Sequence, residues 1–130
     1  VLVARLLRRD AGVSIEEVQR QLDEAREMLL GNLTRLLPHL DPARCADLLV
    51  DPHRIFGYAQ LVALDSAMCG ARGDPGSAAV LAARAIALAE AAIARIDPVP
   101  KDWTDWVAAA RLDVEAAPDL TPPAGGPASA

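Results

Sequence analysis

Apolar residues recur along the chain at the three- and four-residue spacing that is typical of amphipathic α-helices. Asp-Pro pairs punctuate this pattern, and Asp is a preferred helix cap while Pro fits the first helical turn. Together the two signals predict helices at about residues 1–9, 15–37, 42–50, 53–71, 75–96 and 102–116. The expected fold is an all-α helical bundle of about six helices.

The segment 15–37 shows the clearest pattern and is predicted to be one long amphipathic helix. Ser14 and Glu17 form an S-x-x-E capping box at its start, and Pro38 limits its end. Spacings of three and four residues alternate along a heptad seam formed by Ile15, Val18, Leu22, Ala25, Leu29, Asn32 and Leu36. Such a seam needs a partner, which is either another helix of the same chain or the equivalent helix of a second chain.

We expect the second alternative, a homodimer through Ile15, Val18, Leu22, Leu29, Asn32 and Leu36. Asn32 is the only Asn of the chain. A polar residue at a seam position can fix register and oligomeric state, or it can lie at the rim and be solvated. Both interpretations of Asn32 stay open at this point.

The composition agrees with a helical core. Hydrophobic residues make up 52% of the chain and aromatic residues only 3%, so the core is built from Ala, Leu, Val and Ile. Residues 118–130 are rich in Pro, Ala and Gly and have little to bury, which predicts a disordered tail. The run from 78 to 96 is apolar but contains Arg84, Glu90 and Arg95, which indicates a buried helix of the bundle rather than a membrane span.

The formal net charge is −5, which argues against a chain that binds nucleic acid by itself. No secretory signal pattern stands at the start, and two cysteines cannot form a disulfide framework. We therefore expect a cytoplasmic protein with reduced thiols and no membrane contact. Because the first residue is Val1, either an alternative start codon is used or upstream sequence is missing.

The sequence offers little chemistry. The possible soft metal ligands His39, Cys45, His53 and Cys69 lack the usual ligand spacings, so we expect no metal site and no cofactor. Asp65 lies in an apolar helix, where its pKa can be raised. We expect it to cap a helix, to pair with an Arg such as Arg84 or Arg95, or to face water. We expect no enzyme activity.

The aromatic residues of the chain are Phe56, Tyr58, Trp103 and Trp106. Trp103 and Trp106 belong to an apolar stripe on the last predicted helix, where they would anchor that helix to the bundle. The alternative is that the four residues wall a pocket for an apolar or cationic ligand.

The stretch "RRDAGVSIEEVQRQL" resembles the second half of a MerR-type DNA-binding domain. The residues Gly12 to Val18 and Leu22 match the loop and fourth helix of that family, and Val3, Leu6 and Leu7 followed by two Arg match its third helix. The resemblance covers about residues 1–30 and implies that the following long helix pairs antiparallel in a dimer. The helix-turn-helix that reads bases would precede Val1, so it implies only phosphate contacts here, from Arg5, Arg8 and Arg9.

This resemblance divides the chain into a hairpin with a dimerisation helix at 1–37, an effector or interaction bundle at 38–117 and the tail at 118–130. It implies the dimerisation and effector portion of a MerR-like transcriptional regulator without its base-reading module, which binds DNA only through an upstream helix-turn-helix. Its partner would be a small-molecule or protein effector. As an alternative, "DPGSAAVLAARAIALAEAA" is similar to helices of tetratricopeptide-like proteins, which implies a protein-binding scaffold with no role on DNA.

Overall fold

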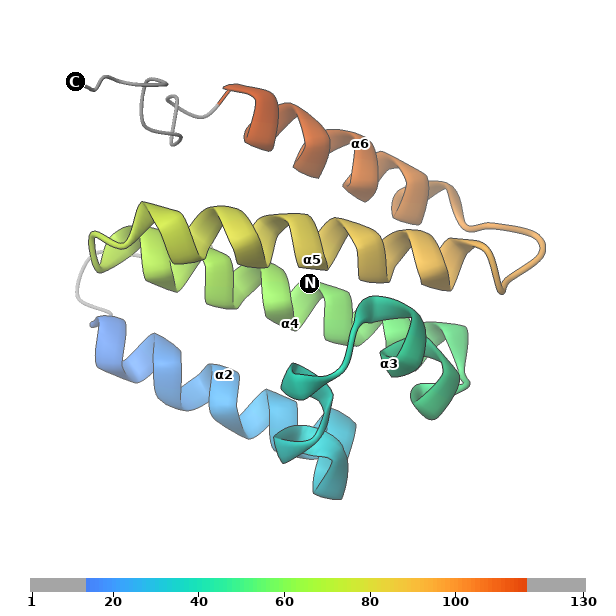
Figure 1. Ribbon diagram of the computed structural model, residues 1–130, viewed down its shortest axis with the longest axis horizontal. Helices are drawn as coiled ribbons and strands as arrows, with labels where there is room; N and C mark the ends of the chain where they lie inside the picture. The colour runs from blue at the N-terminus through green and yellow to red at the C-terminus, as the bar shows by residue number, and fades with distance from the viewer. Residues whose placement is uncertain (1–13, 117–130) are drawn as a thin grey trace.

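A computed structural model describes residues 14–116 and shows a helical bundle (Figure 1). The α-helices are α2 (Ile15–Leu30), α3 (Pro42–Leu49), α4 (Pro52–Ala71), α5 (Pro75–Ile93) and α6 (Lys101–Ala116). Two short 3-10 helices, η1 (Gly31–Arg35) and η2 (Leu37–His39), connect α2 to α3. Residues 14–116 contain no strand, which confirms the all-α prediction. The helix predicted at 1–9, the residues Arg5, Arg8 and Arg9, and the predicted tail lie outside the described residues.

Side-chain caps fix where the helices begin. The carboxylates of Asp41, Asp51 and Asp74 accept hydrogen bonds from backbone N–H groups two or three residues later, at 2.8, 2.9 and 3.1 Å. Each is followed by Pro at the first helical position. The fourth Asp-Pro pair, at 97–98, begins no helix, because α6 starts at Lys101.

The long helix predicted for 15–37 is wrong over its last third, residues 31–37. Ser14 caps α2 as expected by accepting from the N–H of Glu17 at 3.0 Å, but α2 ends at Leu30. Gly31 adopts a φ of 55°, which ends the α-helical hydrogen bonding. The chain then continues with shorter i to i+3 bonds through η1 and η2. The apolar spacing therefore runs on across a backbone that is no longer α-helical.

The centre of the bundle is the antiparallel pair α4 and α5, joined by a tight turn in which Gly73 has a φ of 82°. Figure 1 shows α2 beside α4 and α6 beside α5, and α5 contacts α3, α4 and α6. α5 therefore lies at the centre of the bundle, with its first turns exposed. Among the described helices, α5 is long and apolar enough to cross a membrane by length and composition, a property that core helices share.

The corner between α3 and α4 is a tight γ-turn centred on Val50. Its φ and ψ are 66° and −58°, and the N–H of Asp51 donates to the carbonyl of Leu49 at 2.7 Å. This conformation is rare for a β-branched residue because it brings Cβ close to the backbone. The Val50 side chain is 72% exposed, so burial does little to offset the cost of its positive φ.

Candidate functional site

The first half of α6 is fixed to α4 by aromatic packing. Trp103 and Val107 are buried, and the Trp103 ring stacks on Phe56 with ring centroids 4.4 Å apart and planes 4° apart. Trp106 meets the same Phe56 ring edge-on at 5.5 Å. Stacked and edge-on aromatic pairs of this kind add to the stabilisation from burial. Phe56 and Trp103 are thus anchors of the bundle.

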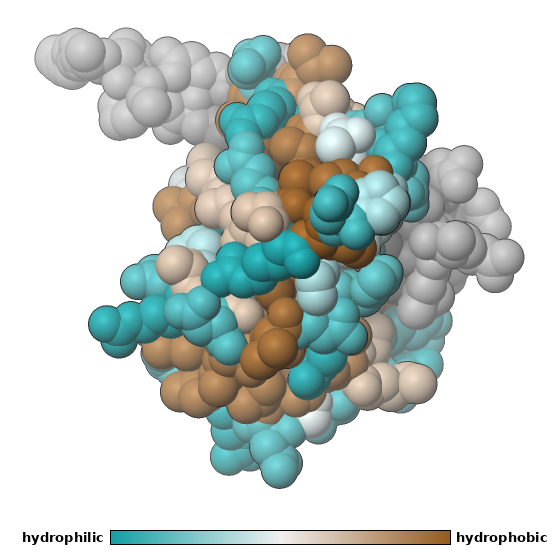
Figure 2. All heavy atoms as spheres, turned by 90° about the vertical axis from the view of Figure 1, so that its right-hand side faces the viewer, coloured by the Kyte–Doolittle hydropathy of each residue, from teal (hydrophilic) through white to brown (hydrophobic). Residues whose placement is uncertain are grey.

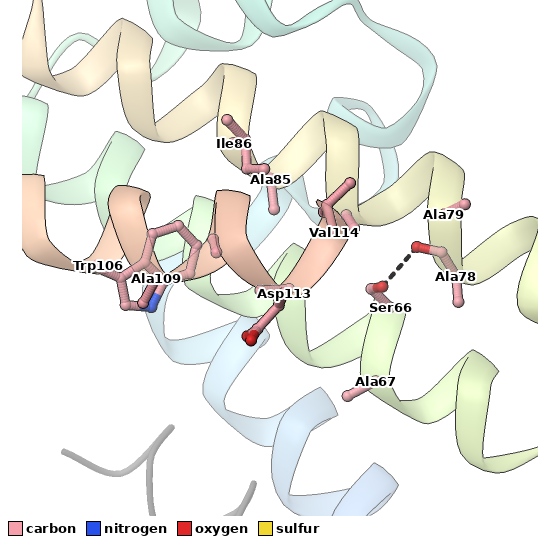
Figure 3. Close-up of a pocket in the computed structure, with 13 residues that line it drawn as sticks. Ser66, Ala67, Ala78, Ala79, Ala85, Ile86, Trp106, Ala109, Asp113 and Val114 are labelled. Atoms are coloured by element: carbon pink, nitrogen blue, oxygen red, sulfur yellow. Dashed lines mark hydrogen bonds between the residues drawn. The ribbon is translucent and has the colours of Figure 1, made fainter. Parts of the chain in front are cut away.

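The second half of α6 covers a pocket rather than a packed core. Leu112 and Val114 are exposed there, and a cavity of about 370 Å³ lies between α4, α5 and α6 (Figure 3). Alanines from all three helices form most of its wall: Ala63, Ala67, Ala78, Ala79, Ala82, Ala85, Ala109 and Ala110. The other lining residues are Ser66, Ile86, Trp106, Asp113 and Val114. A wall of methyl groups leaves the space that larger side chains would fill.

Two polar side chains reach this pocket. The hydroxyl of Ser66 on α4 donates to the carbonyl of Ala78 on α5 at 2.6 Å, so its proton is already engaged (Figure 3). Asp113 lies on α6, seven residues after Trp106 and therefore on the same side of the helix. Within residues 14–116, Asp113 forms neither an ion pair nor a side-chain hydrogen bond. The Asp113 side chain is exposed at the rim, and it is the only ionisable group among the described residues of the wall.

Of the four aromatic residues offered as pocket walls, Trp106 alone lines this cavity. Phe56 and Trp103 belong to the anchor, and Tyr58 is buried beside Arg84. The alanines were the signal that sequence reasoning missed. Residues 78, 82 and 85 follow a helical spacing on α5 and face the alanines of α6, so small residues meet small residues and leave a cavity.

A second polar cluster joins α5 to the segment that precedes α3. Arg84 donates to the carbonyls of Leu40 and Leu37 at 2.7 and 2.8 Å, and its guanidinium also contacts Cys45 Sγ and the Tyr58 hydroxyl. Burial raises the pKa of the Cys45 thiol, and the nearby Arg84 only partly offsets this shift. Burial raises the pKa of Tyr58 in the same way. Both groups stay protonated at neutral pH, so this cluster is structural.

The possible soft metal ligands lie apart from one another. His39 and His53 are exposed on different elements, whereas Cys45 is buried and Cys69 lies near the end of α4. Residues 14–116 contain no group of three His, Cys, Asp or Glu side chains that could hold an ion. The fold therefore does not bring together the side chains that the sequence singled out.

The heptad seam packs, over its first half, on the same chain. Val18 and Leu22 are buried against Leu61, Leu64 and Met68 of α4. Farther along the seam, Leu29 is half-buried, whereas Asn32 and Leu36 are less enclosed, with Leu36 46% exposed. The side chain of Ile15 lies outside what the structure describes. Among the seam residues whose side chains the structure describes, those at the C-terminal end therefore remain open to another chain.

Apolar side chains are also exposed at the end of the molecule that carries α3 (Figure 2). Leu48 and Val50 lie at the C-terminal end of α3, and Leu36 lies between η1 and η2. Met28, near the end of α2, is 89% exposed.

No protein-family model, curated protein or solved structure matches this chain. The likeness of residues 1–30 to MerR-type domains and that of residues 74–92 to tetratricopeptide-like helices therefore stay predictions. The function is inferred from the residues and their geometry.

Proposed function

We propose that this chain is the dimerisation and effector portion of a MerR-like transcriptional regulator, and that its effector binds between α4, α5 and α6. The observation that carries this proposal is the cavity of about 370 Å³. Its volume falls within the range of small-molecule sites, and its lining of apolar groups with a few polar ones is typical of such sites. A ligand there would be enclosed by one helix hairpin and one covering helix.

The arrangement of α4 supports a link between this pocket and the N-terminal part of the chain. Ala63, Ser66 and Ala67 of α4 line the pocket, while Leu61 and Leu64 of the same helix pack on α2. A ligand that displaces α4 therefore acts on α2. The sequence that resembles a DNA-binding domain leads directly into α2. The effector would therefore act by changing the position of α2.

In this proposal the regulator is a homodimer that uses the open end of the seam. Met28, Asn32 and Leu36 are available for that contact, whereas Val18 and Leu22 are not. Sedimentation equilibrium measures the self-association directly. We expect Leu36→Ser to weaken the dimer. The control is Leu112→Ser, which changes an exposed Leu away from the seam, on α6, and should leave the dimer unchanged. A wild-type chain that is monomeric at tens of micromolar would contradict the dimer.

DNA binding is tested with the full product of the natural gene, including any residues encoded ahead of Val1. Repeated selection from random duplex DNA should enrich one sequence with two half-sites, because a dimer binds a matching pair. Replacing Arg5, Arg8 and Arg9 with Ala should weaken binding to all sequences alike. It should also reduce the slope of log K against log salt by about 0.9 for each phosphate that is no longer neutralised. Failure to enrich any sequence would overturn the regulator proposal.

The second candidate is a tetratricopeptide-like scaffold that binds another protein and has no role on DNA. The exposed Leu36, Leu48 and Val50 around α3 favour it. This candidate requires a folded monomer with an accessible apolar surface and no sequence selected from random DNA. The two measurements above therefore separate the two candidates.

A further inference from the structure

Among residues 14–116, the lining of the pocket under α6 carries a single formal charge, and it is negative. Asp113 lines the pocket, and no Lys, Arg or His of the described residues does. The neighbouring cation on α6, Arg111, is paired with Glu90 of α5. The whole chain has a formal net charge of −5, so its long-range field has the same sign as the pocket. An anionic ligand would find no counter-charge in the lining.

The remaining lining selects for an apolar body. The alanine methyl groups cannot donate or accept hydrogen bonds, and the Ser66 proton is engaged with Ala78. A ligand with many polar groups would therefore lose hydrogen bonds to water without replacing them. Trp106 adds an indole ring on the same side of α6 as Asp113. An indole face attracts a cation more strongly than the other aromatic rings do.

We propose that the pocket binds small organic monocations, such as a benzylic quaternary ammonium, with the charged head at Asp113, which is exposed at the rim on the side of α6 that also carries Trp106. The apolar body would lie against the alanines of α4 and α5. The cavity of about 370 Å³ limits the ligand to a compact molecule with a single charge, since Asp113 is the one carboxylate among the described lining residues. This inference names the ligand class of the effector site proposed above, but the binding itself needs no DNA.

The test uses the full chain and two probes of nearly the same shape. Benzyltrimethylammonium carries the positive charge, and neopentylbenzene is its neutral carbon analogue. Binding is followed by the fluorescence of Trp106 in a Trp103→Phe background, where Trp106 is the only Trp. We expect the cation to bind more tightly than the neutral analogue, and added NaCl to weaken the binding of the cation.

Asp113→Asn should weaken the binding of the cation about threefold to fivefold and leave the neutral analogue unchanged, as expected for a partly solvated ion pair. Asp102→Asn is the matched control, because Asp102 is an exposed carboxylate at the other end of α6. It should change neither affinity. Circular dichroism checks that both variants keep their helices.

Equal affinity for the two probes, an unchanged affinity in Asp113→Asn, or no binding of the cation at millimolar concentration would each overturn this inference. These outcomes are independent of the DNA selection. Cation binding without a selected DNA sequence would reject the regulator and keep the ligand site. A selected DNA sequence without cation binding would keep the regulator and reject the cation site.

Discussion

The guanidinium of Arg26 lies 2.5 Å from the carboxylate of Asp65 and ties α2 to α4. Both side chains are largely shielded, with 15% and 30% of their surfaces exposed. The sequence suggested Arg84 or Arg95 as partners, but Arg84 binds backbone carbonyls and Arg95 binds Asp47. Burial raises the pKa of Asp65 above its ordinary value, and Arg26 only partly offsets that effect.

This raised pKa predicts how the stability of the protein depends on pH. The folded state favours the protonated carboxyl, so the stabilising contribution of Asp65 is complete below its unfolded pKa. It is lost as the pH rises through the higher folded pKa. We expect the stability of the wild type relative to Asp65→Asn to fall over that interval, measured by urea unfolding from about pH 3.5 to about pH 7. If the relative stability rose with pH instead, the ion pair with Arg26 would outweigh burial and lower the pKa of Asp65.

Arg84→Met should lower the free energy of unfolding by about 2 kcal/mol, because the carbonyls of Leu37 and Leu40 both lose a charged donor and are left to share the weak Cys45 thiol. Met keeps much of the apolar length of Arg. The control is Arg44→Met, which changes an exposed Arg on α3. It should shift stability by no more than about 0.5 kcal/mol. Equal effects of the two changes in urea unfolding would contradict the role of Arg84.

Val50→Gly should stabilise the protein by about 1 kcal/mol, because Gly adopts a positive φ without the cost that Val50 bears. Gly31→Ala is the reverse experiment. Open space surrounds a Cβ at position 31, so any loss there comes from its φ of 55° alone. We expect Gly31→Ala to destabilise by about 1 kcal/mol. Thermal unfolding of both variants shows whether each change stabilises or destabilises the protein. A Val50→Gly variant less stable than the wild type would contradict backbone strain at Val50.

The two Trp residues should differ in their effect on stability. Trp103→Ala removes the buried ring stacked on Phe56 and should cost about 3–5 kcal/mol. Trp106→Ala removes a half-buried ring that borders a cavity, so it should cost less than about 2 kcal/mol. If the two variants lost similar amounts of stability in urea unfolding, Trp106 would be packed as tightly as Trp103, and the cavity beside it would be contradicted.

The helix starts could be predicted from the sequence because capping is local chemistry. Asp41, Asp51 and Asp74 each supply an oxygen to a backbone N–H close by, and no distant contact is needed. The end of α2 could not be predicted in the same way. Its apolar spacing continues past Gly31, and only the backbone conformation of this residue shows that the helix stops there.

The candidate site was harder to predict because it is an unfilled space between helices. Small alanine side chains let α4 and α5 pack closely. Whether α6 packs equally closely depends on where Trp103 and Phe56 hold it, which is a tertiary relationship. The partner of the seam was likewise decided by α4, which supplies Leu61 and Leu64 to cover Leu22.

The alanine wall has a mechanical consequence. Alanine has no side-chain torsion to rotate, so most of the surface that α4 and α5 present to the pocket cannot be reshaped by rotamer changes; Ser66 and Ile86 are the exceptions. A bulkier guest would therefore have to displace a helix. The covering helix α6 is held near its start by Trp103 and farther along by the ion pair of Arg111 with Glu90. A guest that moves the second half of α6 would have to break that ion pair, so guest size is coupled to a contact between α5 and α6.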